Sequence, residues 1–262
     1  MIHNLWQYRQ FIYSSVKRDF MARYKGSVLG VLWAVFQPLS MILVYTVIFS
    51  QVMQNRLAGM EMLPYAYSIY LCAGTLPWNL FSEVLMGCTG VFFANANLMK
   101  KVSFPRICLP AITVCSALVN FAIGFALFVV FMGLIGHFPW RTFLAVIPLL
   151  GLEIVFTVTL GIGLAVMNVF FRDIGQIMGI LLQFWFWFTP IVYPAQILPD
   201  WATSILSINP MYHLMAAFQG IFLYDRLPDL WGLLYVLVWS ILLGIWAIRL
   251  YHHHAGELVD EL

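Results

Sequence analysis

The sequence is poor in charge. Only 9% of its 262 residues are charged, whereas 63% are hydrophobic. A soluble domain carries about 25% charged residues, and so few charges could not cover the surface of a water-soluble chain of this length. Several apolar runs exceed the ~20 residues that cross a bilayer. They are continuous, which excludes a transmembrane β-barrel with its alternating ~10-residue segments. The sequence therefore predicts an all-α membrane protein.

Other features that the sequence lacks exclude several chemistries. Its four cysteines form no CxxC pair, which argues against a disulfide framework or a zinc site. The run His252-His253-His254 has only Glu257 nearby as a further ligand, so it is predicted to be a flexible tail and not a metal site. No G-x-x-x-x-G-K-S/T phosphate loop occurs, and the chain therefore cannot hydrolyse ATP by that mechanism. The net charge of +2 gives no indication of nucleic-acid binding.

Six transmembrane helices are predicted within a single domain over residues 1–262. Residues 1–28 would form a cytoplasmic interface helix, residues 29–250 the six spans, and residues 251–262 a cytoplasmic tail. The predicted spans are residues 29–53, 65–91, 107–135, 142–169, 174–190 and 229–250.

Residues 191–228, between the fifth and sixth spans, are apolar but interrupted by Pro194, Pro199, Pro210 and Pro228. The segment is too broken for a simple span and too apolar for a free loop. Because irregular backbone at membrane depth needs protein or water around it, the segment is predicted to form two short re-entrant helices at the outer face.

The N-terminal segment 4–23 has the pattern of a helix lying on the membrane. Apolar residues recur at three- and four-residue steps, and polar residues occupy the opposite side. This pattern is typical of an interfacial helix, although a cytoplasmic helix packed on a partner would have the same one. The apolar positions are Leu5, Tyr8, Ile12, Val16 and Phe20, and the polar ones are Gln7, Gln10, Ser14, Lys17 and Arg18.

The distribution of basic residues predicts the orientation. Of the 13 Lys and Arg residues, 10 fall on one side of the predicted spans and 3 on the other. Positive charge is concentrated on the cytoplasmic side of membrane proteins, so both termini are expected in the cytoplasm. The inner set is Arg9, Lys17, Arg18, Arg23, Lys25, Lys100, Lys101, Arg106, Arg172 and Arg249, and the outer set is Arg56, Arg141 and Arg226.

Two carboxylates, Glu83 and Glu153, lie within predicted spans. A charge at mid-bilayer costs about 2.5–3.5 kcal/mol on insertion scales, so each side chain should face protein or water, or else be protonated. Both are candidates for binding hydroxyl groups along a pore. A structural pair with a Thr, Tyr or Asn of a neighbouring helix is the favoured alternative.

Five consecutive aromatic residues, Phe184-Trp-Phe-Trp-Phe188, end the fifth span, and Tyr193 follows. Aromatic rings can stack on the C–H faces of sugars, so Phe184, Trp185, Trp187, Phe188 and Tyr193 are candidates for lining a pore. On a helix Phe184 and Phe188 share one face, while Trp185 and Trp187 point elsewhere, so not all of them can do so. The alternative is an aromatic belt at the membrane interface.

A set of short motifs occurs in order along most of the chain. They are Arg23-Tyr-Lys-Gly-Ser-Val-Leu-Gly30 followed by Pro38, Gly74-Thr-Leu-Pro-Trp78, the stretch from Asn95 to Pro110, Arg172-Asp173, Thr189-Pro-Ile-Val-Tyr-Pro194 and Asn209-Pro-Met211. With this set the chain resembles the membrane subunits of ABC-2-type exporters. It is most similar to those that export lipid-linked polysaccharides such as O-antigen, capsule or teichoic acid chains.

The resemblance implies roles for the loops. The loop around residues 95–106 would form a coupling helix that docks on an ATPase, and a second contact would lie near residue 172. Segment 191–228 would supply gate helices at the outer mouth. The implied coupling residues are Asn97, Lys100, Lys101, Phe104, Arg106, Arg172 and Asp173.

The resemblance also implies partners and location. A separate cytoplasmic nucleotide-binding ATPase subunit would bind ATP and Mg, while this chain would bind no cofactor and would not be an enzyme. Two copies would form a homodimer around a shared pore in the bacterial inner membrane. The substrate would be a polyprenyl-diphosphate-linked glycan, with no role for nucleic acid. Arg23 and Lys25 could meet the diphosphate, but a plain anchor to membrane lipid explains them as well.

Two alternatives remain at this point. The first keeps the family and changes the cargo to a drug or a lipid. The second is an intramembrane glycosyl- or acyltransferase, which would need clustered acidic or histidine residues at a membrane surface. Only Asp225 and Asp229, near Arg226, approach such a cluster.

Overall fold

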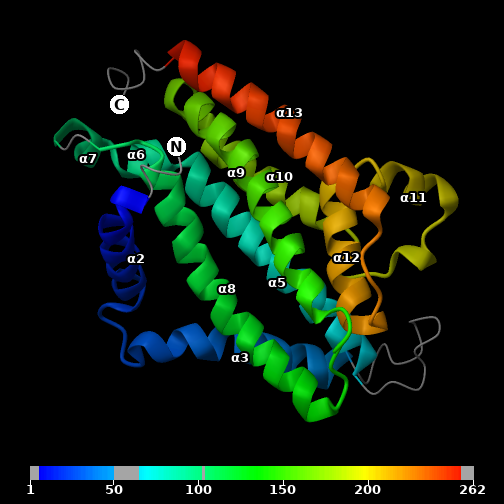
Figure 1. Cartoon of the computed structure of the whole chain (residues 1–262). Coiled ribbons are helices and arrows are strands. Elements are labelled where there is room, and N and C mark those ends of the chain that lie inside the picture. Colours follow the sequence, from blue (N-terminus) through cyan, green and yellow to red (C-terminus); the bar gives the residue numbers. More distant parts are fainter. Residues whose placement is uncertain (1–5, 50–64, 102–103, 255–262) are drawn as a thin grey trace.

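Helix α5 (Ala66–Thr89) is the central helix of the bundle (Figure 1). Of its 24 residues, 19 are buried. Three helices pack most extensively against it: α8 (Cys108–Ile135), α9 (Val146–Phe170) and α12 (Pro210–Tyr224). A helix enclosed in this way contacts protein on nearly every side. It therefore tolerates polar residues that a lipid-facing helix would not.

The computed structural model describes residues 6–49, 65–101 and 104–254. Within these residues the chain forms helices and turns and contains no strand, which confirms the all-α prediction. Four helical segments among them are long and apolar enough to cross a membrane. They coincide with the predicted first, third, fourth and sixth spans. These segments are Gly30–Val47, Cys108–Ile135, Phe143–Phe170 and Leu230–His254.

The predicted second and fifth spans correspond to α5 and to α10 (Asp173–Trp187). Helix α5 is long enough, but polar residues such as Asn79 and Glu83 lower its hydropathy. Helix α10 has 15 residues, which rise about 22 Å. It stops three residues before Pro190, whose ring cannot continue a helix. Burial of α5 allows its lower hydropathy, and Pro190 limits the length of α10. For these reasons the two segments differ from the remaining spans.

The most extensive helix packing of the described chain joins α9 to α13 (Leu230–His254). A Cβ added to Gly163 would lie 1.9 Å from Cζ3 of Trp246, so the indole ring lies directly on the backbone of α9. On α13, a Cβ added to Gly244 would meet Thr159 at 3.3 Å. Small residues allow helices in a membrane to approach closely, because packing is the main attraction available there.

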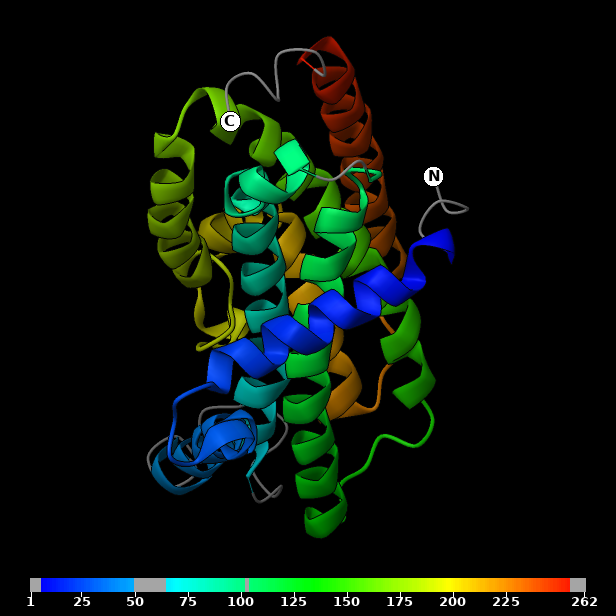
Figure 2. The same ribbon diagram turned by 90° about the vertical axis from the view of Figure 1, so that its left-hand side faces the viewer.

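Helix α2 (Arg9–Tyr24) crosses the outside of α8 obliquely (Figure 2). The apolar stripe predicted for this segment faces the bundle, and the polar side is exposed. The stripe is therefore confirmed for the described positions, whereas Leu5 lies outside them. The half-buried residues of the stripe are Tyr8, Ile12, Val16 and Phe20.

A sharp turn separates α2 from α3 (Trp33–Val44). Gly26 and Gly30 in this turn have φ angles of 87° and 52°, in the left-handed region that favours glycine. Helix α3 then crosses α8 instead of running beside it (Figure 1). Positions 50–53 of the predicted first span lie outside the described residues. The short elements flanking α3 are η1 (Gly30–Leu32) and η2 (Tyr45–Phe49).

Residues 195–224 contain η4 (Ala195–Ile197), α11 (Asp200–Leu206) and α12. Two α-helices occur in this segment, but α12 has 15 residues, the same number as α10, and is therefore not short. Its length follows from the sequence, since no proline interrupts it after Pro210. The side chain of Asn209 caps its first turn by accepting a hydrogen bond from Met211 N at 3.0 Å.

One end of the bundle holds the start of α2, the end of α13 and two short helices, α6 (Val91–Ala94) and α7 (Ala96–Lys101) (Figure 1). We call it the inner end, because its basic residues belong to the set that the sequence predicts on the cytoplasmic side. Helix α13 continues to His254, four residues past the predicted span, so the expectation of a flexible tail was wrong for residues 251–254. The ring of His254 packs 4.8 Å from that of Phe170, which holds this last turn in place.

We predict that Gly163→Ala weakens the contact between α9 and α13. The added Cβ would displace the Trp246 ring, and overpacking of this kind costs about 1–3 kcal/mol. The melting temperature of the purified protein in detergent should fall by several degrees.

Gly151→Ala in the same helix is the matched control, because its Cβ would meet no atom within 4 Å. Its melting temperature should stay the same or rise slightly, since alanine is the better helix former by about 1 kcal/mol. Equal losses in the two variants would contradict the packing argument.

Candidate functional site

One stripe of α5 is left uncovered. The five residues of this helix that are not buried are Asn79, Ser82, Glu83, Met86 and Gly87. Residues spaced by three and four positions lie on one face of a helix. Asn79, Ser82 and Glu83 make this face polar, and a polar face cannot be left to lipid. The α5 stripe, as we call these five residues, therefore requires water, a ligand or further protein.

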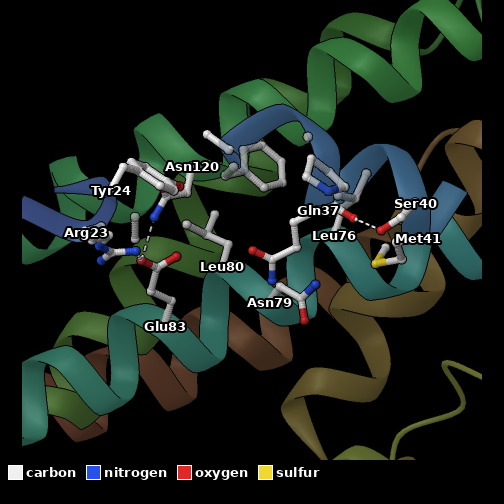
Figure 3. A pocket seen from close by; sticks show the side chains of 15 residues that line it. Arg23, Tyr24, Gln37, Ser40, Met41, Leu76, Asn79, Leu80, Glu83 and Asn120 are labelled. Carbon is white, nitrogen blue, oxygen red and sulfur yellow. Dashed lines mark hydrogen bonds and ion pairs between the residues drawn. The ribbon is translucent and has the colours of Figure 1, made fainter. Parts of the chain in front are cut away.

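A cavity of about 520 Å³ lies on one side of the α5 stripe, between α3, α5 and α8 (Figure 3). The C-terminal end of α2 contributes to its wall. Leu76, Leu80 and Phe121 are among its apolar lining residues. Its polar lining consists of Arg23, Tyr24, Gln37, Ser40, Asn79, Glu83 and Asn120.

Arg23 and Glu83 form an ion pair at one end of this cavity (Figure 3). Arg23 Nη1 lies 2.6 Å from Glu83 Oε1, and Asn120 Nδ2 donates to the same oxygen at 2.8 Å. The two charged side chains are 45% and 30% exposed. No described residue donates a hydrogen bond to the second oxygen, Oε2.

Asn120 is the kind of neighbour expected for a carboxylate within a span. The sequence did not indicate that Glu83 pairs with Arg23. From the sequence, Arg23 is expected to be an anchor at the inner membrane surface or a contact for diphosphate. Arg23 and Glu83 are far apart in the chain, so no local pattern connects them. Only the oblique path of α2 across the bundle brings them together.

A groove of about 600 Å³ lies on the other side of the α5 stripe, between α5 and α10. Asn79 borders both the groove and the cavity. The exposed amides of Gln37, Asn79 and Gln183 make no side-chain hydrogen bond within the described residues, and sequence reasoning singled out none of the three. The groove is lined by Trp78, Asn79, Ser82, Leu182, Gln183, Phe186 and Trp187.

The aromatic run at the end of α10 divides between two faces. Phe184, Trp187 and Phe188 are exposed by 59–62%. Trp185 points into the bundle, where its Nε1 donates to Asn209 Oδ1 at 2.8 Å and its ring packs 5.2 Å from that of Phe81.

Hydrogen bonds hold the irregular segment after α10 against α5 and α12. The Tyr70 hydroxyl lies 2.7 Å from Pro190 O and 2.8 Å from Tyr193 O. Gln219 Nε2 donates to Pro190 O at 3.1 Å. These side chains replace the backbone partners that an irregular segment lacks. The proline-broken segment is consequently fixed to the bundle.

The last two predicted pore residues, Tyr193 and Glu153, line neither the cavity nor the groove. The hydroxyl of Tyr193 donates to Trp187 O at 2.5 Å, and burial raises the pKa of this hydroxyl. Glu153 is fully buried in α9 and does not line the cavity or the groove. Its carboxylate oxygens have no hydrogen-bond partner among the described residues. The structure thus does not bring Glu153 together with Glu83.

The two loops implied in coupling meet at the inner end. The Arg172 guanidinium lies over the Phe93 ring, 5.4 Å from its centroid, and joins the start of α10 to α6. Most of the implied coupling residues project outward from this surface. Those exposed are Asn97, Lys100, Lys101, Arg172 and Asp173, and those half-buried are Phe104 and Arg106.

Helix α2 connects the inner end to the cavity. Near its start, the ring centroid of Phe11 lies 5.5 Å from that of Phe104. Near its end, Arg23 pairs with Glu83. The intervening residues span about 18 Å of α-helix. A single rigid element therefore touches both the inner surface and the α5 stripe.

The acidic pair that an intramembrane enzyme would use has structural roles instead. Asp225 Oδ1 accepts a hydrogen bond from the Thr142 hydroxyl at 2.7 Å. Asp229 Oδ2 accepts one from Gly232 N at 3.1 Å and caps the start of α13. Both carboxylates are thus engaged with the chain itself.

The chain belongs to the ABC-2 type transporter family, which matches residues 10–223. This range includes the α5 stripe, the cavity, the groove and the inner surface. The protein is therefore the transmembrane permease subunit of an ABC exporter.

Curated relatives extend this assignment. The chain is 34% identical over 250 residues to the O-antigen export system permease protein RfbA of Myxococcus xanthus, covering 94% of this chain and 93% of the relative. It is 29% identical to the protein of the same name from Klebsiella pneumoniae, over 87% of this chain and 85% of that protein. The polysialic acid transport protein KpsM of Escherichia coli is 24% identical, over 76% of this chain and 75% of its own length.

We predict that Tyr70→Phe loosens the segment around residues 190–193. The change removes the Tyr70 hydroxyl from both carbonyls. Pro190 O keeps the hydrogen bond from Gln219, whereas Tyr193 O loses its partner among the described residues, and an unsatisfied buried group costs about 1–3 kcal/mol. Amide hydrogen exchange in this segment should become measurably faster.

Tyr212→Phe serves as the control, because no hydrogen bond from the Tyr212 hydroxyl is found among the described residues. In the Tyr212→Phe variant, amide hydrogen exchange around residue 212 should not change. Wild-type exchange rates in Tyr70→Phe would show that the hydroxyl does not hold the segment.

Proposed function

We propose that this chain is the permease of an ATP-driven exporter that moves a lipid-linked polysaccharide, such as O-antigen, across the bacterial inner membrane. The names of the relatives from Myxococcus and Klebsiella support this cargo. The α5 stripe is the structural observation that carries the proposal. Its polar groups suit the hydroxyls of a glycan, whereas a path for a purely apolar lipid or drug would not need them.

A second copy of the chain covers the α5 stripe in this proposal. The exposed amide of Asn79 in the stripe, and those of Gln37 and Gln183 beside it, lack partners within the described chain. Inside a membrane such groups must face water or protein. Two copies facing one another across their α5 stripes would enclose a polar path, and this arrangement is the homodimer.

The proposed topology has six crossings within one domain, residues 1–262, and both termini in the cytoplasm. The inner end carries Lys100, Lys101 and Arg172, in accord with the excess of positive charge on cytoplasmic surfaces. Helices α11 and α12 would then lie at the outer mouth as re-entrant gate helices. The hydrogen bonds of Tyr70 and Gln219 support this placement, since a gate needs a fixed base.

A separate nucleotide-binding ATPase, with its ATP and Mg, would dock on the inner surface formed by α7 and the start of α10. This chain would bind no cofactor itself. Movement of that surface would reach Phe104 and, through Phe11, helix α2. Helix α2 would transmit it to Glu83 through Arg23. The half-buried Phe104 is then a link within the chain, and the exposed lysines are the docking contacts.

The proposed pore uses the predicted aromatic residues unequally. Phe184, Trp187 and Phe188 are exposed and available to stack on sugars. Trp185 and Tyr193 hold the outer segment through their hydrogen bonds. Glu83 belongs to the path, and Glu153 is a buried residue of α9.

The function is tested by deleting the gene for this chain. Surface polysaccharide should disappear, while its lipid-linked precursor accumulates inside the cell. Both can be followed on immunoblots, with a plasmid copy of the gene as the control. Intact surface polysaccharide in the deletion strain would refute the proposed cargo, and a lost tolerance to a drug would then favour the drug permease.

Coupling is tested by reversing two charges, Lys100→Glu with Lys101→Glu. A charge reversal at a docking surface removes its electrostatic complementarity, which should weaken binding about tenfold or more. The permease should then stimulate the ATPase less in a co-purified complex, and export should fall. Both side chains are exposed, so the melting temperature should not change.

Arg141→Glu is the matched charge reversal at the opposite end of the bundle. It should leave both activities intact. Unchanged ATPase stimulation in the lysine variant would count against α7 as the docking element.

A further inference from the structure

We propose that the cavity between α3, α5 and α8 is a binding site for a neutral sugar unit, recognised through its hydroxyls, and not for the diphosphate of the carrier lipid. This inference rests on the proposed function and deepens it. It assigns the sugar to a site formed within a single copy of the chain, at the α5 stripe (Figure 3).

The charge of the cavity argues against a diphosphate. Arg23 and Glu83 are the charged residues of its lining, and they neutralise each other at 2.6 Å. A diphosphate is normally bound by cations that are free to form charge-assisted hydrogen bonds. Here it would compete with Glu83 for Arg23 and would meet a carboxylate. A neutral ligand does not compete for Arg23 and is not repelled by the carboxylate.

The polar groups that remain match hydroxyls. Glu83 Oε2 receives no hydrogen bond from the described residues, and the amides of Gln37 and Asn79 make none with them. Figure 3 shows both amides at the wall of the same cavity. A carboxylate accepts hydrogen bonds, and an amide both donates and accepts them. A hydroxyl does both, so a polyol can satisfy all three groups.

The apolar lining and the size of the cavity also suit a sugar. Leu76, Leu80 and Phe121 offer apolar surface to the C–H faces of a pyranose, and Tyr24 adds a second ring. A volume of about 520 Å³ falls within the usual ~300–1,000 Å³ of small-molecule sites. Groups this polar inside a membrane require a polar partner, which a sugar provides together with water.

The position of the cavity places it on the route of the glycan. Asn79 borders the cavity and also the groove along α10. Trp78 and Trp187 line that groove. A sugar bound in the cavity would therefore lie next to the aromatic part of the path, with one amide common to both.

Photocrosslinking tests the site directly. In the purified permease–ATPase complex in nanodiscs, Ser40 would be replaced by photoreactive p-benzoylphenylalanine. Ser40 lines the cavity and is exposed, and among the described residues its hydroxyl donates only to the nearby Gln37 O. The control position is Leu242, 53% exposed on α13, across the bundle from α3 (Figure 1). The two probes are the polyprenyl-diphosphate-linked glycan extracted from cells and sugar-free undecaprenyl diphosphate.

The glycan-bearing lipid should label the Ser40 position about fivefold or more above the Leu242 position, as expected for a specific site. The sugar-free lipid should label both positions equally. Strong labelling of the Ser40 position by the sugar-free lipid would overturn the proposal in favour of a diphosphate site. If neither probe labels it above control while export depends on the chain, the cavity proposal fails and the proposed function stands. Export that persists without the chain refutes the function itself.

The double variant Gln37→Leu with Asn79→Leu gives an independent measurement. Both side chains are exposed and make no hydrogen bond within the described residues, so the melting temperature should not fall. Loss of the amides should reduce export about tenfold, as expected for two lost hydrogen bonds. Asn79→Gln, which keeps the amide, should retain most of the activity. Wild-type export by the leucine pair would overturn the proposal.

Discussion

A polar side chain inside the hydrocarbon layer must find a polar partner, and this requirement organises the chain around α5. The helix buries 19 of its 24 residues against neighbouring helices and gathers its polar groups on the side that they leave open. Arg23 and Asn120 satisfy one oxygen of Glu83 there. The same rule applies to the outer segment, where tyrosine and glutamine side chains on α5 and α12 meet the carbonyl of Pro190.

The requirement also explains how distant parts of the chain are connected. Arg23 reaches Glu83 only because α2 leaves the inner end and crosses α8. The other end of α2 contacts Phe104, next to the exposed lysines of α7. The Gly26 and Gly30 turn allows α2 and α3 to point in different directions. The two glycines adopt this turn with little backbone strain.

Much of the fold could be predicted from the sequence, because hydropathy and helical periodicity are local properties. They located the long spans, the apolar side of α2 and a helical outer segment. The prolines of segment 191–228 suggested short helices, although none interrupts α12 after Pro210. Local patterns could not show the helical end of α13, since it depends on the packing of His254 against Phe170. The candidate site was harder to predict from the sequence than the fold. Glu83 is unusual for a span on sequence alone, but Gln37, Asn79 and Gln183 are ordinary amides until the structure shows them exposed and without hydrogen bonds to the described residues.

Asn79 is shared by the cavity and the groove, and this has a consequence for polymers. A glycan that slides along α5 in the proposed pore exchanges one hydroxyl for the next at the same amide, so the hydrogen bonds lost and gained at each step balance. The free energy of the bound chain then depends on the few units in contact and not on the total number of repeats. Such a passage would set no upper limit on the length of the polymer that it carries.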